Sequence, residues 1–187
     1  MNEMDYQKAL ELLRAGNARA AMEGAWALSQ RGDGHGDAVL GAVYEFGGDG
    51  VERNLNTALH YYRASVEKSA SVEGGLGIAR IQYRGTAGPR DIDEAFRIYK
   101  VVADTSAHYV AQYMVGKMYL DGEAVQKDLA EAERYARLAL KNRNIYAFEL
   151  LAAVSTAKGL KWQALVWRLK LKIAFSLCKN SYRVRKI

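Results

Sequence analysis

The stretch VGKMYLDGEAVQKDLAEAERYARLA, residues 115–139, has a recognisable copy 37 residues closer to the N-terminus. Two series of small residues keep this spacing along the chain. They are Ala58, Ala95 and Ala132 in one series and Gly48, Gly85 and Gly122 in the other. Self-similarity at a fixed period of this size is typical of stacked repeats, each made of one supersecondary unit.

The sequence pattern predicts that each repeat begins with a helix, called helix A. This helix has a small residue at its middle and a glycine about six residues later. A small side chain lets a neighbouring helix approach closely, and a glycine in the left-handed conformation ends the helix. The small residues are Gly41, Ala79, Gly116 and Ala153, and the glycines are Gly47, Gly85, Gly122 and Gly159.

The second helix of each repeat, helix B, is predicted to begin after Asn54, Asp91 or Asp128, whose side chains can accept a hydrogen bond at the N-cap. Glu94 and Glu131 follow two of these caps after three residues, the spacing of a capping box. Tyrosines at helical spacing then predict a buried stripe. They are Tyr61, Tyr62, Tyr99 and Tyr135.

The chain of 187 residues therefore reads as an all-α protein of about five helical hairpins. The outer hairpins are degenerate copies, because a terminal repeat lacks a neighbour on one face. We expect one repeat domain over residues 1–180. Its hairpins span 3–33, 36–69, 70–107, 108–144 and 145–178, and a basic tail, 179–187, follows.

The segments 40–62 and 115–136 resemble the Sel1-like repeat, a relative of the tetratricopeptide repeat. The third full repeat carries nearly all of that family's pattern, in Gly116, Tyr119, Gly122, Val125, Asp128, Ala132 and Tyr135. The resemblance implies a right-handed α/α solenoid that serves as a non-catalytic adaptor. Some bacterial members carry a disulfide in every repeat, and the cysteines that this requires are missing here.

The composition of the chain indicates its cellular compartment and shows where its charge lies. The N-terminus lacks a signal-peptide pattern, no apolar run reaches the roughly 18 residues of a membrane span, and Cys178 is the only cysteine. We therefore expect a cytoplasmic protein. The net charge is +6, yet no acidic residue follows Glu149, so the basic character lies at the C-terminal end.

Nothing in the sequence predicts an enzyme. His35, His60 and His108 lack the spacing of metal ligands, and no phosphate-binding or nucleophile motif is present. The segment GDGHGD, residues 32–37, could suggest a metal loop, but a flexible turn between hairpins is the favoured interpretation because calcium loops need more regularly spaced oxygens. We predict no catalytic residue, no metal and no cofactor.

A partner protein or peptide is predicted to bind the concave face formed by the A helices. Positions that the repeat pattern does not use should point there, and their mixture of tyrosine and arginine is favoured in interface hot spots. The candidates are Glu45, Arg80, Tyr83, Arg84, Gln112, Tyr113 and Lys117. The alternative for any one of them is an ordinary solvated helix position.

The C-terminal helix offers a second surface. At 100° per residue, Lys161, Arg168, Lys172 and Lys179 fall on one basic stripe beside a thick apolar face bearing Trp162 and Trp167. Such a helix could lie on an anionic membrane surface. The favoured interpretation is a capping helix whose lysines keep the end of the solenoid soluble. Nucleic acid, suggested by the tail SYRVRKI, ranks last, because a few charges would bind it only weakly.

The sequence therefore predicts an adaptor or scaffold for protein–protein interactions. The resemblance allows two narrower roles, since similar bacterial proteins neutralise toxins as immunity proteins or accompany cell-envelope polysaccharide machinery. In the second role the basic helix would place the protein peripherally at the inner face of the membrane. The sequence does not distinguish them, nor does it give the oligomeric state.

Overall fold

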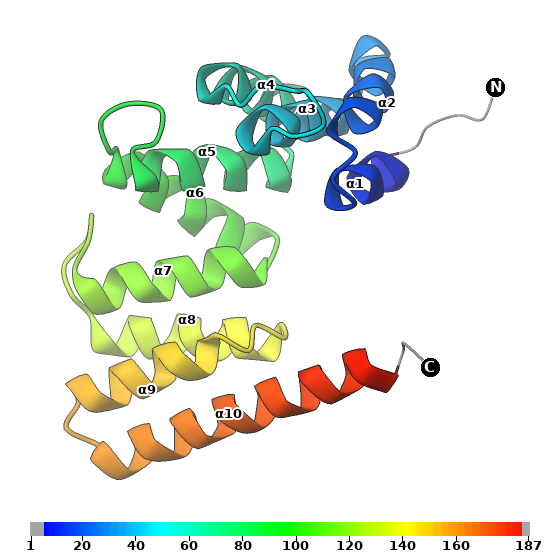
Figure 1. Cartoon of the computed structure of the whole chain (residues 1–187). Coiled ribbons are helices and arrows are strands. Elements are labelled where there is room, and N and C mark those ends of the chain that lie inside the picture. The colour runs from blue at the N-terminus through cyan, green and yellow to red at the C-terminus, as the bar shows by residue number, and fades with distance from the viewer. Residues whose placement is uncertain (1–5, 185–187) are drawn as a thin grey trace. The chain divides into compact units, whose positions relative to one another are not determined.

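A computed structural model of the protein describes residues 6–184, which form ten α-helices in five consecutive hairpins (Figure 1). The helices of the first three hairpins are α1 (Tyr6–Arg14), α2 (Ala18–Gln30), α3 (Gly34–Phe46), α4 (Leu55–Ser69), α5 (Val72–Arg84) and α6 (Ile92–Thr105). Those of the last two are α7 (Tyr109–Asp121), α8 (Leu129–Lys141), α9 (Ala147–Ala157) and α10 (Lys161–Val184). The all-α class and the helix order agree with the sequence prediction.

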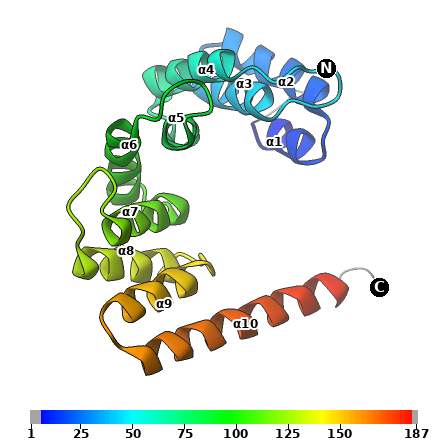
Figure 2. The same cartoon turned by 60° about the vertical axis from the view of Figure 1, so that its left-hand side comes forward.

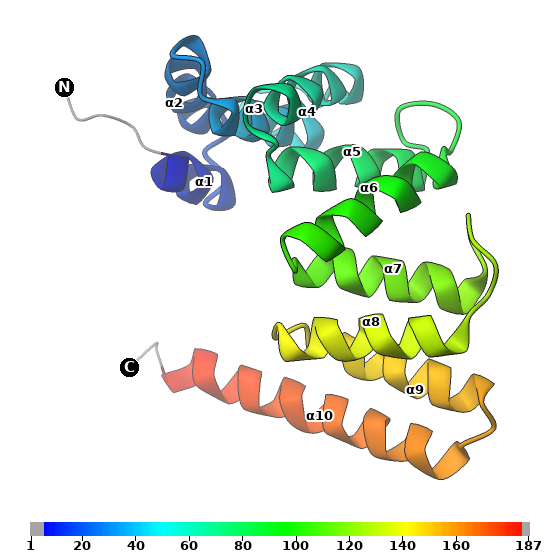
Figure 3. The ribbon, with the colours of Figure 1, turned by 180° about the vertical axis from the view of Figure 1, so that it is seen from behind.

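The chain divides into two compact units, and the boundary between them in the sequence falls inside α6. The first unit ends at Ile98 and the second begins at Tyr99. In the first unit α3 packs on α2, α4 and α5, and in the second α8 packs on α7 and α9 (Figure 2). The hairpin α9–α10 closes the second unit, and its two helices run in opposite directions (Figure 3).

The predicted N-caps form in all three central repeats. Asn54 accepts a hydrogen bond from the backbone N–H of Thr57 at 3.0 Å. Asp91 and Asp128 likewise accept from the backbone N–H three residues further on, at 2.9 and 3.0 Å. These bonds satisfy N–H groups that the first helical turn leaves unpaired.

The capping boxes do not close among the described residues. Glu94 pairs with Arg97, and Glu131 binds Arg134 through two hydrogen bonds of 2.9 and 2.8 Å. An arginine three residues further along an exposed helix offers the glutamate a charged partner, which a backbone N–H does not. Both carboxylates therefore form ion pairs along the helix instead.

The core of the first unit contains Tyr62 of α4, whose ring lies between glycines of two different helices. A Cβ added to Gly41 of α3 would lie 2.5 Å from one edge of the ring, and one added to Gly77 of α5 would lie 2.4 Å from the other. Tyr62 is 2% exposed. Gly41, the small residue at the middle of α3, and Gly77 of α5 thus make room for a tyrosine of helix B.

The second unit buries Tyr135 of α8, which the 37-residue period aligns with Tyr61 of α4. Its hydroxyl donates a 2.7 Å hydrogen bond to Asp104, which also pairs with Lys100 at 2.5 Å. Burial raises the pKa of the Asp104 carboxyl, but hydrogen bonds from Lys100 and Tyr135 outweigh it, so the pKa lies below its usual value. The buried tyrosine is therefore tied to the end of α6.

The helix α10 continues to Val184, past the point where the sequence predicted a separate tail. Its inner face packs on the preceding helices through Ala164 and Trp167, and the Trp167 ring stacks on Phe148 at 6.0 Å between centroids. None of the described helices combines the length and hydrophobicity needed to cross a bilayer.

Candidate partner-binding surfaces

The A helices of the first unit form a groove of about 180 Å³. Its walls come mainly from α1, α3 and α5. The lining residues are Tyr6, Leu10, Ala38, Val39, Ala42, Phe46, Tyr62, Glu73, Leu76 and Arg80. Phe46 is 61% exposed at the end of α3, so this unit presents a large aromatic side chain beside the groove.

Arg80 is held in this groove by a buried carboxylate. Its Nε and Nη2 donate to the two carboxylate oxygens of Glu45 at 2.6 and 2.5 Å, and the Tyr62 hydroxyl donates to the same group at 2.7 Å. The guanidinium lies 5.5 Å from the centroid of the Phe46 ring. Since the Glu45 side chain is 6% exposed and that of Arg80 29%, the carboxylate is internal while the guanidinium reaches solvent.

Tyr6 lines the opposite wall, from α1. Burial, reinforced by the neighbouring Glu73 carboxylate, raises the pKa of Tyr6 to about 12. The phenol therefore stays neutral at ordinary pH and can donate or accept a hydrogen bond. The groove combines an apolar floor with a phenol, a carboxylate and an oriented guanidinium.

The predicted site residues of the first unit divide into three kinds. Glu45 is buried and bonded to Arg80, so it positions another side chain and is not itself a contact surface. Tyr83 is half-buried beneath Arg90, whose guanidinium lies 5.1 Å from the ring centroid. Arg80 reaches the groove, and Arg84 is exposed at the end of α5.

The predicted site residues of the second unit also differ in burial. Gln112 is 2% exposed, and its side-chain oxygen accepts a 2.9 Å hydrogen bond from Asn142, so it serves the interior. Tyr113 is half-buried. Lys117 reaches the surface and pairs with Asp121 one turn later at 2.5 Å. Within this unit Tyr113 and Lys117 stay as candidate contacts.

Phe46 is one of the groove residues that the sequence reasoning missed. It stands five residues after Gly41, and Arg84 stands five residues after Ala79, so the two occupy the same place in consecutive repeats. Comparing repeats position by position would have found it. Leu76 was missed for another reason, because an apolar residue at the start of helix A is expected in the core.

The predicted basic stripe of α10 is partly described. Lys161, Arg168 and Lys172 are exposed, while the side chain of Lys179 lies outside the described residues. The outer face between these cations and Lys170 is apolar. Trp162 is 77% exposed. Four further apolar side chains on this face are each 51% to 65% exposed, namely Leu165, Leu169, Ile173 and Leu177. The helix packs on α9 and exposes its cations, as the favoured capping interpretation expects, but its outer face also exposes apolar side chains.

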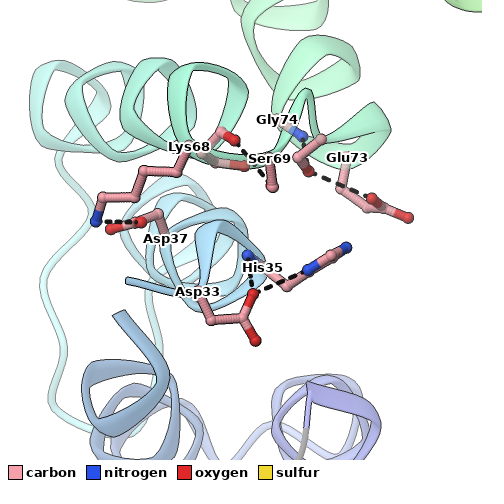
Figure 4. A network of polar contacts seen from close by, with 9 residues as sticks. Asp33, His35, Asp37, Lys68, Ser69, Glu73 and Gly74 are labelled. Carbon is pink, nitrogen blue, oxygen red and sulfur yellow. Dashed lines mark hydrogen bonds and ion pairs between the residues drawn. The ribbon is translucent and has the colours of Figure 1, made fainter. Parts of the chain in front are cut away.

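The segment GDGHGD opens α3 and is not a flexible turn. Asp33 is the N-cap and accepts a 2.9 Å hydrogen bond from the backbone N–H of His35 (Figure 4). Asp37 is buried and binds Lys68 of α4 and Ser29 of α2, each at 2.7 Å. Among residues 6–184 no group of His, Cys, Asp and Glu side chains is arranged to hold a metal ion.

Comparison with known proteins supports the same architecture. The Sel1 repeat model matches residues 38–69, 75–101 and 110–144, about half of the chain. A search of curated protein sequences gave no significant match.

Two solved structures are similar in fold. The Sel1 repeat protein from Oxalobacter formigenes has a TM-score of 0.78 at 20% identity, and the match covers 92% of this chain and 69% of that one. The protein c5321, a protective antigen of uropathogenic Escherichia coli strains with an SLR fold, gives 0.69 at 20% identity, covering 82% of this chain and 33% of that one. The chain belongs to the Sel1 repeat family, and its fold is the α/α solenoid of that family.

Proposed function

We propose that this protein is a non-catalytic adaptor and that a partner protein binds the helix-A groove of the first unit. The observation that carries the proposal is the pairing of Phe46 with Arg80 beside an apolar groove. Aromatic side chains and arginine dominate interface hot spots, because each combines a large apolar area with directional contacts.

The Glu45 carboxylate makes this surface preorganised. A free arginine loses side-chain entropy when a partner fixes it, and that loss weakens binding. Two hydrogen bonds to Glu45 already fix the Arg80 guanidinium in the unbound protein. The guanidinium is thereby presented to a partner protein in one orientation, with 29% of the Arg80 side chain exposed.

The test is capture of partners from native extract by the tagged full-length protein, followed by mass spectrometry. Phe46→Ala and Arg84→Glu change exposed side chains at the groove and the adjacent end of α5, and Lys117→Glu tests the second unit. Arg63→Glu, an exposed position on α4 outside the groove lining, is the matched control. Arg80→Glu is unsuitable, because it would set a second carboxylate against Glu45.

We expect Phe46→Ala and Arg84→Glu to lose the same captured protein that Arg63→Glu retains. Undiminished capture by both groove variants would contradict the placement of the site. The affinity then separates the two adaptor roles, since a single nanomolar partner suits a toxin-neutralising protein and several weaker partners suit a scaffold.

A second candidate function is attachment to an anionic membrane surface through α10. The five exposed apolar side chains from Trp162 to Leu177 lie on one side of the helix, with Lys161, Arg168 and Lys172 beside them. A helix of this kind buries its apolar stripe at the headgroup level, where each basic residue contributes about 1 kcal/mol. The absence of acidic residues after Glu149 adds to the attraction.

Flotation with vesicles of phosphatidylserine and phosphatidylcholine, against phosphatidylcholine alone, tests this function. We expect binding only to the anionic vesicles, reduced at least about 30-fold when Arg168 and Lys172 are both changed to glutamate. Leu169→Ser with Ile173→Ser should also abolish it, while Val101→Ser, an exposed apolar position on α6, should not. Equal failure to float with both vesicle types would remove this candidate.

A further inference from the structure

A pocket of about 260 Å³ lies on the side of the first unit where α2 and α4 flank α3. Its lining residues are Met22, Glu23, Trp26, Leu40, Tyr44 and Tyr61. Three of these six are aromatic, and none of them lines the helix-A groove. The pocket is therefore a separate feature of the molecule.

The aromatic rings form a corner. The rings of Tyr44 and Tyr61 stack in parallel, with centroids 5.7 Å apart and planes at 4°. The Trp26 ring stands nearly perpendicular to Tyr61, at 80° and 6.2 Å. Trp26 is 48% exposed, although an indole of this size is normally more deeply buried in a protein without a partner. Leu40, which is buried, lies beneath the corner.

The only charged residue among the six is acidic. Glu23 lies three residues before Trp26 on α2, so the two side chains share one face of that helix. Glu23 is exposed, and it forms no ion pair within residues 6–184. Aromatic faces attract cations through their quadrupole, and an unpaired carboxylate at the same place adds a full negative charge.

We propose that this pocket binds an arginine side chain of a partner protein. A guanidinium is flat, stacks on aromatic faces and fits a carboxylate through two parallel hydrogen bonds, while its aliphatic stem suits Met22 and Leu40. An uncharged side chain would use the apolar walls but leave Glu23 without a partner, and an acidic one would be repelled. This site is independent of the helix-A groove, so either proposal can fail alone.

The test uses Nα-acetyl-arginine methylamide as the probe and its neutral isostere, Nα-acetyl-citrulline methylamide, as the comparison. The chain has three tryptophans, so its ¹H–¹⁵N spectrum contains three indole signals, and Trp26→Phe identifies the one from Trp26. We expect the arginine probe to shift that signal and to bind about ten-fold more tightly than the citrulline probe.

Two variants complete the experiment. Glu23→Gln should weaken binding of the arginine probe about two- to five-fold. Glu67→Gln, an exposed position on α4 outside the pocket lining, should leave it unchanged. Trp26→Leu keeps apolar volume at this exposed position and, followed through the backbone amide signals of the pocket residues, should reduce the preference for arginine over citrulline to the two- to five-fold that Glu23 supplies. Equal binding of the two probes to the unaltered protein, or no shift of the Trp26 signal at millimolar probe, would overturn the proposal.

Discussion

Glu45→Gln is the most informative single change in the first unit, because the Glu45 carboxylate accepts three hydrogen bonds. They come from Arg80 Nε at 2.6 Å, Arg80 Nη2 at 2.5 Å and the Tyr62 hydroxyl at 2.7 Å. Glutamine keeps the shape of the side chain but removes its charge. It also turns one oxygen into an NH₂ group that faces the donors of Arg80.

The loss of stability in Glu45→Gln depends on how well Arg80 and Tyr62 can replace the hydrogen bonds that they lose. Removing one partner of a fully buried ion pair costs about 3–5 kcal/mol. Arg80 is 29% exposed and can regain water, which reduces the cost. The Tyr62 hydroxyl is buried and loses its charged acceptor, which adds about 1 kcal/mol. We expect a loss of about 2–4 kcal/mol in the free energy of unfolding.

Urea unfolding followed by tryptophan fluorescence measures this loss. Trp162 and Trp167 are first replaced by phenylalanine, so that Trp26 reports on the first unit alone. With a urea dependence of about 2 kcal/mol per molar, the midpoint should fall by about 1–2 M. The matched control is Glu94→Gln, which removes the exposed pair with Arg97 in the same unit and should cost about 0.5 kcal/mol or less. An equal cost for the two variants would refute the account of Glu45 as a buried positioning group.

Three further predictions concern the cores of the two units and the wall of the helix-A groove. Gly77→Ala adds a Cβ 2.4 Å from the ring of Tyr62, so we expect a loss of about 2 kcal/mol in urea unfolding after the gain in helix propensity is counted. The loss should vanish in a Tyr62→Leu background, and its persistence there would exclude the ring as the cause. Because the pKa of Asp104 is lowered in the folded protein, its contribution to stability is present above the ordinary value of 3.8 and is lost as the pH falls. Asp104→Asn should therefore flatten the decline of the thermal midpoint in acid, and a decline as steep as in the parent would contradict this. Burial raises the pKa of Tyr6 to about 12, so the stability it contributes is complete below about pH 10 and is lost as the pH rises through 12. Thermal melts between pH 9 and 12 should show a shallower alkaline decline for Tyr6→Phe than for the parent protein, and identical slopes would count against it.

The features that the sequence predicted best depend on local spacing. The N-caps at Asn54, Asp91 and Asp128 bond to residues three positions away, so the pattern of one helix start contains both partners. The buried tyrosines Tyr62 and Tyr135 follow from helical periodicity within one repeat. The repeat period itself fixed the number of hairpins.

The burial of charged and polar residues could not be predicted from local spacing. Glu45 and Arg80 are 35 residues apart, and Gln112 and Asn142 are 30 apart, so each pair joins different helices. The pattern within one helix shows that such residues lie off its apolar stripe. It does not show whether another helix covers them. Glu45 and Gln112 are therefore buried, although the sequence predicted them as contacts for a partner protein.

The exposed apolar side chains on the outer face of α10 were not predicted, for a different reason. The helix carries apolar side chains over more than half of its circumference, and periodicity does not say which part packs on α9. The structure places Ala164 and Trp167 inside and Leu169 and Ile173 outside. A cap with a polar outer face would need a narrower apolar stripe than this sequence has.

The position of the Tyr62 ring also bears on how the first unit moves. In an ideal repeat array each hairpin touches only its neighbours and can open from the end inward, one unit at a time. Here one ring, anchored in α4, fills the space beside Gly41 of α3 and Gly77 of α5. Separating either helix would expose the ring to water and leave a void beside the other. We expect the amide protons of these three helices to exchange with solvent at a shared, slow rate, as one cooperative block that spans two hairpins.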